Sequence, residues 1–471
     1  MAKRLPDVRL GLAVAAARAT TFGLRKTGRG GGTAAPGLVA DFLDPDLLGK
    51  VSRRLDRGVV VVAGTNGKTT TSRMIADIFT ADGSRVVHNR SGSNLLRGIA
   101  AAFAGQTSIL GRPKGNIGVV ETDEAAFPAI VRRLQPSVIL LNNLFRDQLD
   151  RYGELDAIAS RWSTALADLP ESTTVVVNAD DPTLAEITRG TPARRVTFGL
   201  NETRYRLDRL PHASDSAVCR RCGADLEYSA LYSSHLGNWR CPNCTAARPP
   251  LDVVGSSIQL NGVDDLEMSI AFPGDLSERF RTGVPGLYNA YNTLAAAAVA
   301  DVFGVSTGAL REALAGFRSA FGRIERITLE GRLLTLALVK NPVGFNEVLR
   351  MLTGSGERLS EPTMIVINDR FADGRDVSWL WDVEFEMLSG GSVPLAAAGI
   401  RGADMANRLH YAGVESARIT ALGAEPGPAI DAFVASLPEN GRGYILATYT
   451  AMLDLRANLA ARGAVEQFWE Q

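Results

Sequence analysis

The stretch VVVVAGTNGKTTTSRMIADIF, residues 59–79, decides the fold of this chain. Its opening valines are typical of a strand that is buried on both faces. The glycine-bracketed turn that follows carries Lys68 and three threonines. Apolar residues then recur at helical spacing, namely Met74, Ile75, Ile78 and Phe79. A strand, a glycine-rich turn and a helix in this order predict a phosphate-binding loop of a parallel α/β sheet.

The turn itself has the residue types that hold the phosphates of ATP. Its backbone N–H groups and the N-terminus of the next helix would cradle phosphate oxygens. Lys68 would neutralise the phosphate charge, and the hydroxyl of Thr69 would bind Mg²⁺. The competing interpretation is an ordinary turn of small residues, against which the lysine and the hydroxyls argue. The predicted nucleotide-binding residues of the turn are Gly64, Thr65, Asn66, Gly67, Lys68, Thr69 and Thr70.

Further oxygen ligands for Mg²⁺ are expected where the next strands end. Glu121 ends an apolar run in VVETDEAAF, with Asp123 and Glu124 close behind it. Asn142 and Asn143 follow the next apolar run. Each group alone is also consistent with a helix cap or a solvated loop. Because the carboxyl ends of parallel strands share one edge of a sheet, we predict Glu121 as a magnesium ligand.

Length and composition indicate a globular protein of about three domains. The chain has 471 residues, 45% of them hydrophobic, and its 51 basic and 51 acidic residues balance. This neutral balance argues against a nucleic-acid partner. We predict an N-terminal helix with a glycine-rich lead-in over residues 1–47, and a central ATPase domain over 48–322. A smaller Rossmann-like α/β domain is predicted over 323–471.

The N-terminal segment RLGLAVAAARA, residues 9–19, loosely resembles a secretion signal. Arg18 interrupts its short apolar core, and a loop that needs cytosolic nucleotide follows, so we predict an amphipathic helix instead. No apolar stretch reaches the roughly 20 residues of a membrane span. The expected location is the cytoplasm, and a peripheral position at the inner face of the plasma membrane stays open.

All four cysteines lie in a segment, about residues 207–250, that breaks the α/β pattern. They form CRRC and CPNC pairs separated by 18 residues, and comprise Cys219, Cys222, Cys241 and Cys244. Two such knuckles predict a closed, structural Zn²⁺ site. Paired disulfides are the alternative, which a reducing cytoplasm disfavours. His235 lies between the knuckles and is expected to make a local hydrogen bond.

The motifs, taken together, resemble those of the Mur ligase family. They are GTNGKTTT, Glu121 after a strand, NNLFRDQLDRYG from Asn142, NADDP from Asn178, GLYNAYNTLAAAA from Gly286 and FGRIER from Phe321. The resemblance implies transfer of the γ-phosphoryl group of ATP to a carboxylate, and attack of an amine on the acyl phosphate. It also implies that Asn289 and Asn292 lie near the adenine and that Arg323 contacts the nucleotide from a hinge.

Departures from the family pattern narrow the resemblance. Gln148 and Tyr288 stand where these ligases usually have histidine, and Lys340 precedes Asn341 without the usual aspartate. The acceptor is therefore expected to be something other than an ordinary amino acid. With the cysteine segment and INDRFADGRDVSWLWDVEFE (residues 367–386), these departures resemble the MurT-type synthetase subunits of lipid II isoglutaminyl synthases.

This narrower resemblance implies a substrate and a partner. The substrate would be the D-glutamate α-carboxyl of the lipid II stem peptide, amidated to D-isoglutamine. Ammonia would come from a separate glutamine amidotransferase subunit of the GatD type. The residues agree, because a triad glutaminase needs a cysteine backed by histidine. None of the four histidines lies beside a cysteine outside the predicted zinc site.

An aspartate-rich loop after the apolar run MIVIN is the candidate contact with that partner. The resemblance implies that one aspartate completes the partner's Cys-His pair by orienting the imidazole. We favour Asp376, followed by Asp373 and Asp369, although spacing alone does not rank them. Trp379 and Trp381 are expected to fill core. Asp376, Lys68 and Glu121 are thus the predicted catalytic residues.

Two other functions stay open at this point. One is a Mur-type ligase that adds an amino acid, like a folylpolyglutamate synthase, and acts without a partner. The other is a non-catalytic subunit that binds ATP without turnover, because several family histidines are missing.

Overall fold

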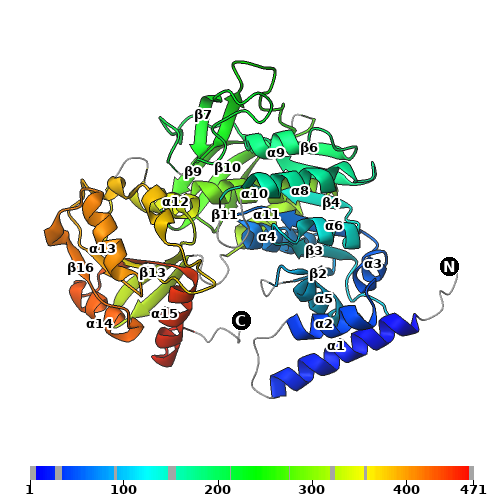
Figure 1. The fold of residues 1–471 in the computed structure, drawn as a ribbon, viewed down its shortest axis with the longest axis horizontal. Helices are drawn as coiled ribbons and strands as arrows, with labels where there is room; N and C mark the ends of the chain where they lie inside the picture. The colour runs from blue at the N-terminus through cyan, green and yellow to red at the C-terminus, as the bar shows by residue number, and fades with distance from the viewer. Residues whose placement is uncertain are drawn as a thin grey trace.

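The structure, a computed structural model, describes residues 7–26, 34–89, 93–146, 155–212, 214–274, 276–318, 324–354 and 358–465. Two bodies lie side by side (Figure 1). The larger is built around a nine-stranded sheet, and the smaller, coloured yellow to red, around a six-stranded sheet. Both are α/β, so the predicted fold class is confirmed.

The nine-stranded sheet has the order β11-β10-β9-β6-β5-β4-β1-β3-β2. Its strands from β2 to β9 pair in parallel, whereas β9, β10 and β11 pair antiparallel. The sheet is therefore mixed and not wholly parallel. In chain order the strands are β1 (Val59–Ala63), β2 (Val86–His88), β3 (Ile117–Glu121), β4 (Val138–Leu141), β5 (Thr174–Asn178), β6 (Arg194–Leu200), β9 (Val253–Asn261), β10 (Asp265–Phe272) and β11 (Leu276–Thr282).

Helices cover both faces of this sheet, which explains why β1 is buried at every position. Val60 and Val62 pack into the core beneath α4 (Lys68–Ala81), α10 (Leu287–Val302) and α11 (Thr307–Gly316). Val59 and Val61 face the opposite core. The helices that contribute to that second core are α1 (Val8–Lys26), α2 (Ala34–Leu43), α3 (Leu47–Ser52), α5 (Leu96–Gly105), α6 (Phe127–Leu134), α8 (Leu155–Ala167) and α9 (Pro182–Ile187).

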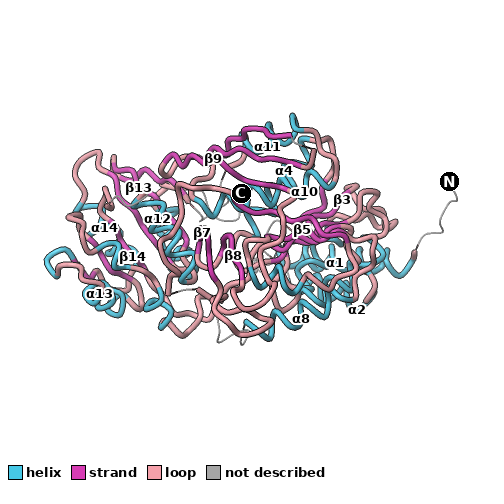
Figure 2. Tube along the Cα trace, turned by 90° about the horizontal axis from the view of Figure 1, so that it is seen from above, coloured by secondary structure: helices cyan, strands magenta, loops and turns pink. Residues whose placement is uncertain are grey.

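The cysteine segment folds as a hairpin of β7 (Glu227–Ser233) and β8 (Leu236–Arg240) with a small core of its own. Seen from above, the hairpin lies between the strands of the two bodies (Figure 2). Arg350, in α12 (Pro342–Thr353) of the smaller body, donates from Nη1 to the carbonyl of Tyr232 at 2.6 Å. The hairpin therefore contacts both bodies.

The smaller body has the strand order β12-β13-β17-β14-β15-β16, and only β12 pairs antiparallel among its described strands. Helices α12 and α13 pack on one face, and α14 and α15 on the other. The elements are β12 (Glu325–Leu329), β13 (Arg332–Leu338), β14 (Thr363–Val366), η1 (Ser378–Asp382), η2 (Phe385–Leu388), β15 (Leu395–Ala398), α13 (Gly402–Tyr411), η3 (Ser416–Arg418), β16 (Ile419–Ala421), α14 (Pro426–Ser436), β17 (Arg442–Ala447) and α15 (Tyr449–Ala461).

A helix is present at the N-terminus as α1, but the expectation that it is amphipathic is wrong, because apolar residues lie on its exposed side as well as its buried side. Residues 27–33 of the glycine-rich lead-in lie outside the described residues. Within the described part of the chain, no helix combines the length and hydropathy needed to cross a membrane.

Candidate active site

The predicted phosphate loop joins β1 to α4 and closes against neighbouring strand ends. The backbone N–H of Asn66 donates to Asn143 Oδ1 at 2.8 Å. Gly67 has φ +82°, and a Cβ atom there would lie 2.1 Å from Asn292 Oδ1. Glycine is needed at this position for both its left-handed backbone and the close approach of α10.

Lys68 is the first residue of α4, and its ammonium group folds back onto the loop. Its Nζ donates to the carbonyl oxygens of Gly64 (2.6 Å) and Thr65 (3.1 Å). It also forms a buried ion pair with Glu124 Oε1 at 2.8 Å. The positive charge is thereby held at the loop and at the N-terminus of α4, where a phosphate would bind.

Thr69 and Glu121 place two hard oxygen donors beside this lysine. The Thr69 hydroxyl donates to Glu121 Oε1 at 3.0 Å. Glu121 is fixed by Asn89, which accepts from its N–H at 3.0 Å and donates to its carbonyl at 2.9 Å. A hydroxyl next to a carboxylate at a phosphate loop is a donor set that fits Mg²⁺.

A cavity of about 430 Å³ opens from this loop and is lined by both bodies. The larger body contributes the loop, Glu121 and Tyr288, and the hairpin adds Ser233 and Leu236. The smaller body contributes Lys340, Gly344, Glu347 and Tyr449, among others. A nucleotide bound at the loop would therefore lie between the two bodies.

Asn341 joins the two bodies at this cavity, and the sequence pointed to no role for it. Its Nδ2 donates to Asn66 Oδ1 at 3.0 Å, and its own Oδ1 accepts from Gly344 N at 2.8 Å as the N-cap of α12. The available signal was an asparagine directly before Pro342, which is typical of a helix start. Its pairing with Asn66 depends on how the bodies pack.

Asn289 and Asn292 lie on α10, directly behind the phosphate loop. Asn292 Oδ1 accepts from Thr71 Oγ1 (3.1 Å) and Asn142 Nδ2 (2.9 Å), and its Nδ2 donates to Asn289 Oδ1 (2.9 Å). Asn292 thus braces the loop, and contact of either residue with adenine stays a prediction. Arg323 and Gln148 lie outside the described residues.

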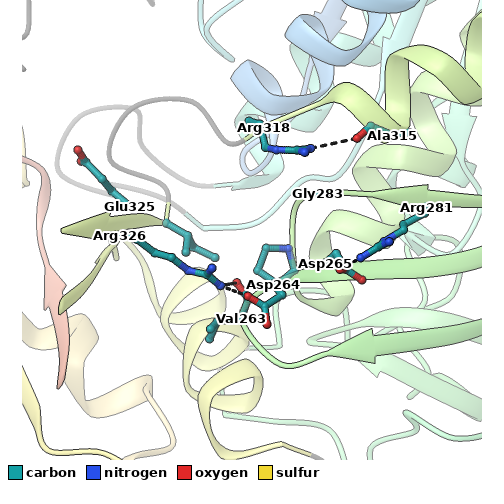
Figure 3. A pocket seen from close by; sticks show the side chains of 11 residues that line it. Val263, Asp264, Asp265, Arg281, Gly283, Ala315, Arg318, Glu325 and Arg326 are labelled. Atoms are coloured by element: carbon teal, nitrogen blue, oxygen red, sulfur yellow. Dashed lines mark hydrogen bonds and ion pairs between the residues drawn. The ribbon is translucent and has the colours of Figure 1, made fainter. Parts of the chain in front are cut away.

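A second cavity, of about 550 Å³, lies between β10–β11 and β12 (Figure 3). Four of its charged side chains form two ion pairs, Arg326 with Asp264 and Arg281 with Asp265, and Arg318 donates to the carbonyl oxygens of Ala315 and Phe317. No phosphate loop or helix N-terminus is among its lining residues, so the first cavity is the candidate active site.

The three candidate aspartates differ in their surroundings. Asp369 pairs with Arg401 at 2.8 Å. Asp373 is buried, and burial raises its pKa. Its carboxylate accepts a hydrogen bond at 2.8 Å from the N–H of Thr450, which lies at the start of α15. Asp376 is exposed. Its carboxylate accepts a hydrogen bond from the backbone N–H of Ser378, and this bond lowers the pKa of Asp376. Asp376 is therefore an ionised carboxylate that faces solvent.

The expectation that both tryptophans of this region fill core is wrong for Trp381. Trp379 is half-buried and packs near Phe345, whereas Trp381 is 53% exposed beside Tyr411. The two lie in the same 3₁₀ helix, η1, two residues apart, and local sequence does not tell which side faces the core.

The four cysteines converge at the base of the hairpin. Their sulfur atoms all lie within 4.8 Å of one another, with Cys219–Cys244 at 3.7 Å and Cys222–Cys241 at 3.5 Å. These separations exceed a disulfide bond of about 2 Å. They match the roughly 3.8 Å between sulfurs on a tetrahedral zinc with Zn–S of about 2.3 Å. The set therefore fits a Zn²⁺ ion.

Interactions within the cluster affect its thiols unequally, since the pKa of Cys222 is lowered whereas that of Cys244 is raised. The backbone N–H of Ala224, with Asn243 and Cys241, lowers the pKa of Cys222 to about 6. His235 is not part of the cluster, since its Nδ1 accepts from the N–H of Asp215 at 3.3 Å. The expected local hydrogen bond of His235 is confirmed.

Two family models match the chain. The Mur ligase middle domain matches residues 62–248, and the MurT ligase C-terminal domain matches residues 338–452. The first match includes the phosphate loop and the cysteine cluster, and the second includes Asn341 and the aspartate loop.

Curated relatives resemble the chain over most of its length. The MurT subunit of the glutamine-hydrolysing lipid II isoglutaminyl synthase of Streptococcus pneumoniae (strain ATCC BAA-255 / R6) is 32% identical over 459 residues, covering 97% of this chain and 98% of the relative. The MurT subunit of Staphylococcus aureus (strain COL) is 31% identical over 387 residues, covering 82% and 84%.

Solved structures share the fold at lower identity. A pseudomurein peptide ligase type C from Methanothermus fervidus superimposes with a TM-score of 0.65 at 18% identity, over 88% of this chain and 80% of the other. MurF ligase from Thermotoga maritima, solved in complex with ADP, gives a TM-score of 0.61 at 15% identity, over 88% and 83%. At such identities the likeness concerns the fold alone.

Proposed function

The chain belongs to the MurT branch of the Mur ligase family of ATP-dependent ligases, and from this premise we propose that it amidates lipid II. The substrate group would be the D-glutamate α-carboxyl of the stem peptide, and the product D-isoglutamine. The observation that carries the proposal is the phosphate loop, where Lys68 and Thr69 lie beside Glu121 of β3 and line a cavity shared by the two bodies.

The reaction would proceed in two balanced steps. A carboxylate oxygen of the substrate attacks the γ-phosphorus of ATP, and ADP leaves. Ammonia then attacks the acyl carbon, inorganic phosphate leaves with the bonding electron pair, and the nitrogen loses a proton. Phosphorylation is needed because an ionised carboxylate has no adequate leaving group.

Residues of this chain would act on the phosphates and not on the carbonyl carbon. Lys68 and the loop N–H groups would bind phosphate oxygens, and Thr69 with Glu121 would hold Mg²⁺, which supplies neutralising charge. The Asn66–Asn341 contact supports closure of the two bodies over the site. Closure would protect the acyl phosphate from water.

Ammonia would be supplied by a GatD-like glutamine amidotransferase in a heterodimer. We assign the contact to the loop of Asp376, whose carboxylate would orient a histidine of the partner. Its exposure supports this choice over Asp373, which is buried, and over Asp369, which is paired with Arg401. The cysteine cluster would hold a structural Zn²⁺ ion, and the chain would work at the inner face of the plasma membrane. We further take residues 48–322 as the ATPase domain and 323–471 as the C-terminal domain.

The deciding experiment offers the purified chain two nitrogen sources. With ATP, Mg²⁺ and lipid II, it should form the amide at high ammonium concentration without any partner. With glutamine, it should do so only when the amidotransferase is added. Mass spectrometry of the stem peptide reads both reactions.

Each alternative predicts a different result. An amino-acid-adding ligase would use an amino acid in place of ammonium and ignore the amidotransferase. A non-catalytic subunit would bind ATP and amidate with neither nitrogen source, and this last outcome would refute the proposal.

A further inference from the structure

Helix α1 is apolar on two opposite sides. One side packs against the larger body through Leu10, Ala13, Val14 and Ala17, which are all buried. The other side faces solvent through Val8, Leu12, Ala15, Ala19 and Phe22. These residues follow one another at spacings of four and three, which places them in one line along the helix. An apolar helix that leaves one whole side exposed needs an explanation.

Neighbouring segments extend this surface on both flanks of α1. Arg9 Nε donates to the carbonyl of Leu43 at 2.7 Å, which ties the end of α2 to one flank. Arg18 donates to the carbonyl of Thr107 at 2.5 Å, which ties the loop after α5 to the other. The two arginines are nine residues apart and so point to opposite flanks.

Both flanks carry large exposed apolar side chains. On α2 these are Leu38 and Phe42, of which Phe42 is 82% exposed, and in the loop they are Ile109 and Leu110. We call the combined surface the N-terminal apolar face; it consists of Val8, Leu12, Phe22, Leu38, Phe42, Ile109 and Leu110. A contiguous apolar surface of this kind marks an interaction site.

The charges around this face are predominantly positive. Helix α1 contains four lysines and arginines and no aspartate or glutamate, in a chain that is neutral overall. Basic residues that are exposed near the face include Arg9, Lys26, Arg97, Arg112 and Lys114. The nearby acidic side chains all face basic partners: Asp7 and Asp44 share Lys50, with Arg54 also acting on Asp7, while Asp41 pairs with Arg133 and Asp46 with Arg53.

We propose that the N-terminal apolar face lies in the headgroup region of an anionic lipid bilayer. Apolar side chains on one side of a helix, bordered by Lys and Arg, are what such an interface takes up. Helix α5 packs against α1 and α2 and begins beside Asn94, which lines the active-site cavity. The face is thereby coupled to the site at which, on the proposed function, a lipid-linked substrate is modified.

Vesicle sedimentation tests the inference without reference to activity. The full chain should bind vesicles of phosphatidylcholine with phosphatidylglycerol, and bind pure phosphatidylcholine vesicles more weakly. The triple variant Leu12→Glu, Phe22→Glu, Phe42→Glu should bind the anionic vesicles about tenfold less or weaker still. Tyr411→Glu makes the same kind of change at an exposed aromatic position of the smaller body, and should leave vesicle binding unaltered.

Equal vesicle binding by the triple variant and the parent chain would overturn the inference. A second outcome would also overturn it: a parent chain that is dimeric and binds no vesicles, together with a triple variant that is monomeric. The face would then join two copies of this chain.

Activity separates this inference from the proposed function. The variant should amidate lipid II in vesicles poorly and a water-soluble muropeptide normally, whereas a parent chain that binds vesicles but amidates neither substrate would refute only the proposed function.

Discussion

Lys68 Nζ lies 2.8 Å from Glu124 Oε1, and both side chains are buried at the phosphate loop. Glu124 is itself anchored, because its carbonyl accepts from Trp162 Nε1 at 2.8 Å. The lysine is therefore held in place by a buried carboxylate and two loop carbonyls before any phosphate arrives. A phosphate at the loop would meet a cation that is already buried and held in position.

Lys68→Ala should abolish amidation from both ammonium and glutamine, a loss of at least about 100-fold, because the phosphate loses its charged donor. It should also unfold more easily, by about 3–5 kcal/mol, since Glu124 is left buried without its cation. Product formation and thermal unfolding measure the two effects.

The double variant Lys68→Ala, Glu124→Gln separates stability from activity. Removing both charges should restore much of the lost unfolding free energy, while activity stays absent. Recovery of amidation in the double variant would show that Lys68 acts only by stabilising the fold.

Gly67→Ala should prevent nucleotide binding, because its Cβ would meet Asn292 Oδ1 at 2.1 Å in a left-handed backbone of φ +82°. Gly83, just beyond the other end of α4, is a matched control: its φ is +80°, and nothing lies within 4 Å of a Cβ built there. Gly83→Ala should cost only about 1–2 kcal/mol of backbone strain and keep ATP affinity. Calorimetric titration with ATP distinguishes the two, and equal affinities would contradict the steric account.

The sequence sufficed for the phosphate loop because its determinants are local. A valine run, glycines at tight positions and an apolar stripe fix β1, the loop and α4 without reference to the rest of the chain. The cysteine cluster was equally predictable, since the two knuckles specify their own geometry.

Features that depend on packing between distant segments were not predictable. The partnership of Asn341 with Asn66 joins residues 275 positions apart and exists only once the two bodies meet. The exposure of Trp381 likewise depends on which side of η1 turns to the core. Alternation of apolar runs also did not reveal that β9, β10 and β11 run antiparallel.

The purified chain should contain about one zinc per molecule, and chelation should lower its unfolding temperature. Cys222→Ser should lose zinc and stability, because three thiolates remain for a four-coordinate ion. Arg220→Ala, which removes only an ion pair with the exposed Asp156, should keep the metal. Metal analysis checks each variant. A chain without zinc, whose thiols react only after reduction, would favour the disulfide alternative.

Asp376→Asn should impair glutamine-driven amidation about tenfold or more while sparing the ammonium-driven reaction, because its carboxylate would serve only the partner's histidine. The lowered pKa of Asp376 keeps its carboxylate ionised throughout the neutral range. The loss of glutamine-driven activity in the variant should therefore be the same at pH 6 and at pH 8.

Asp373→Asn supplies the contrast. That side chain caps α15 through Thr450, so its change should cost about 1 kcal/mol of stability and affect both nitrogen sources alike. Two outcomes would contradict the role of Asp376 in orienting the partner's histidine. One is an equal loss of both reactions in Asp376→Asn, and the other is a loss of only the glutamine-driven reaction in Asp373→Asn.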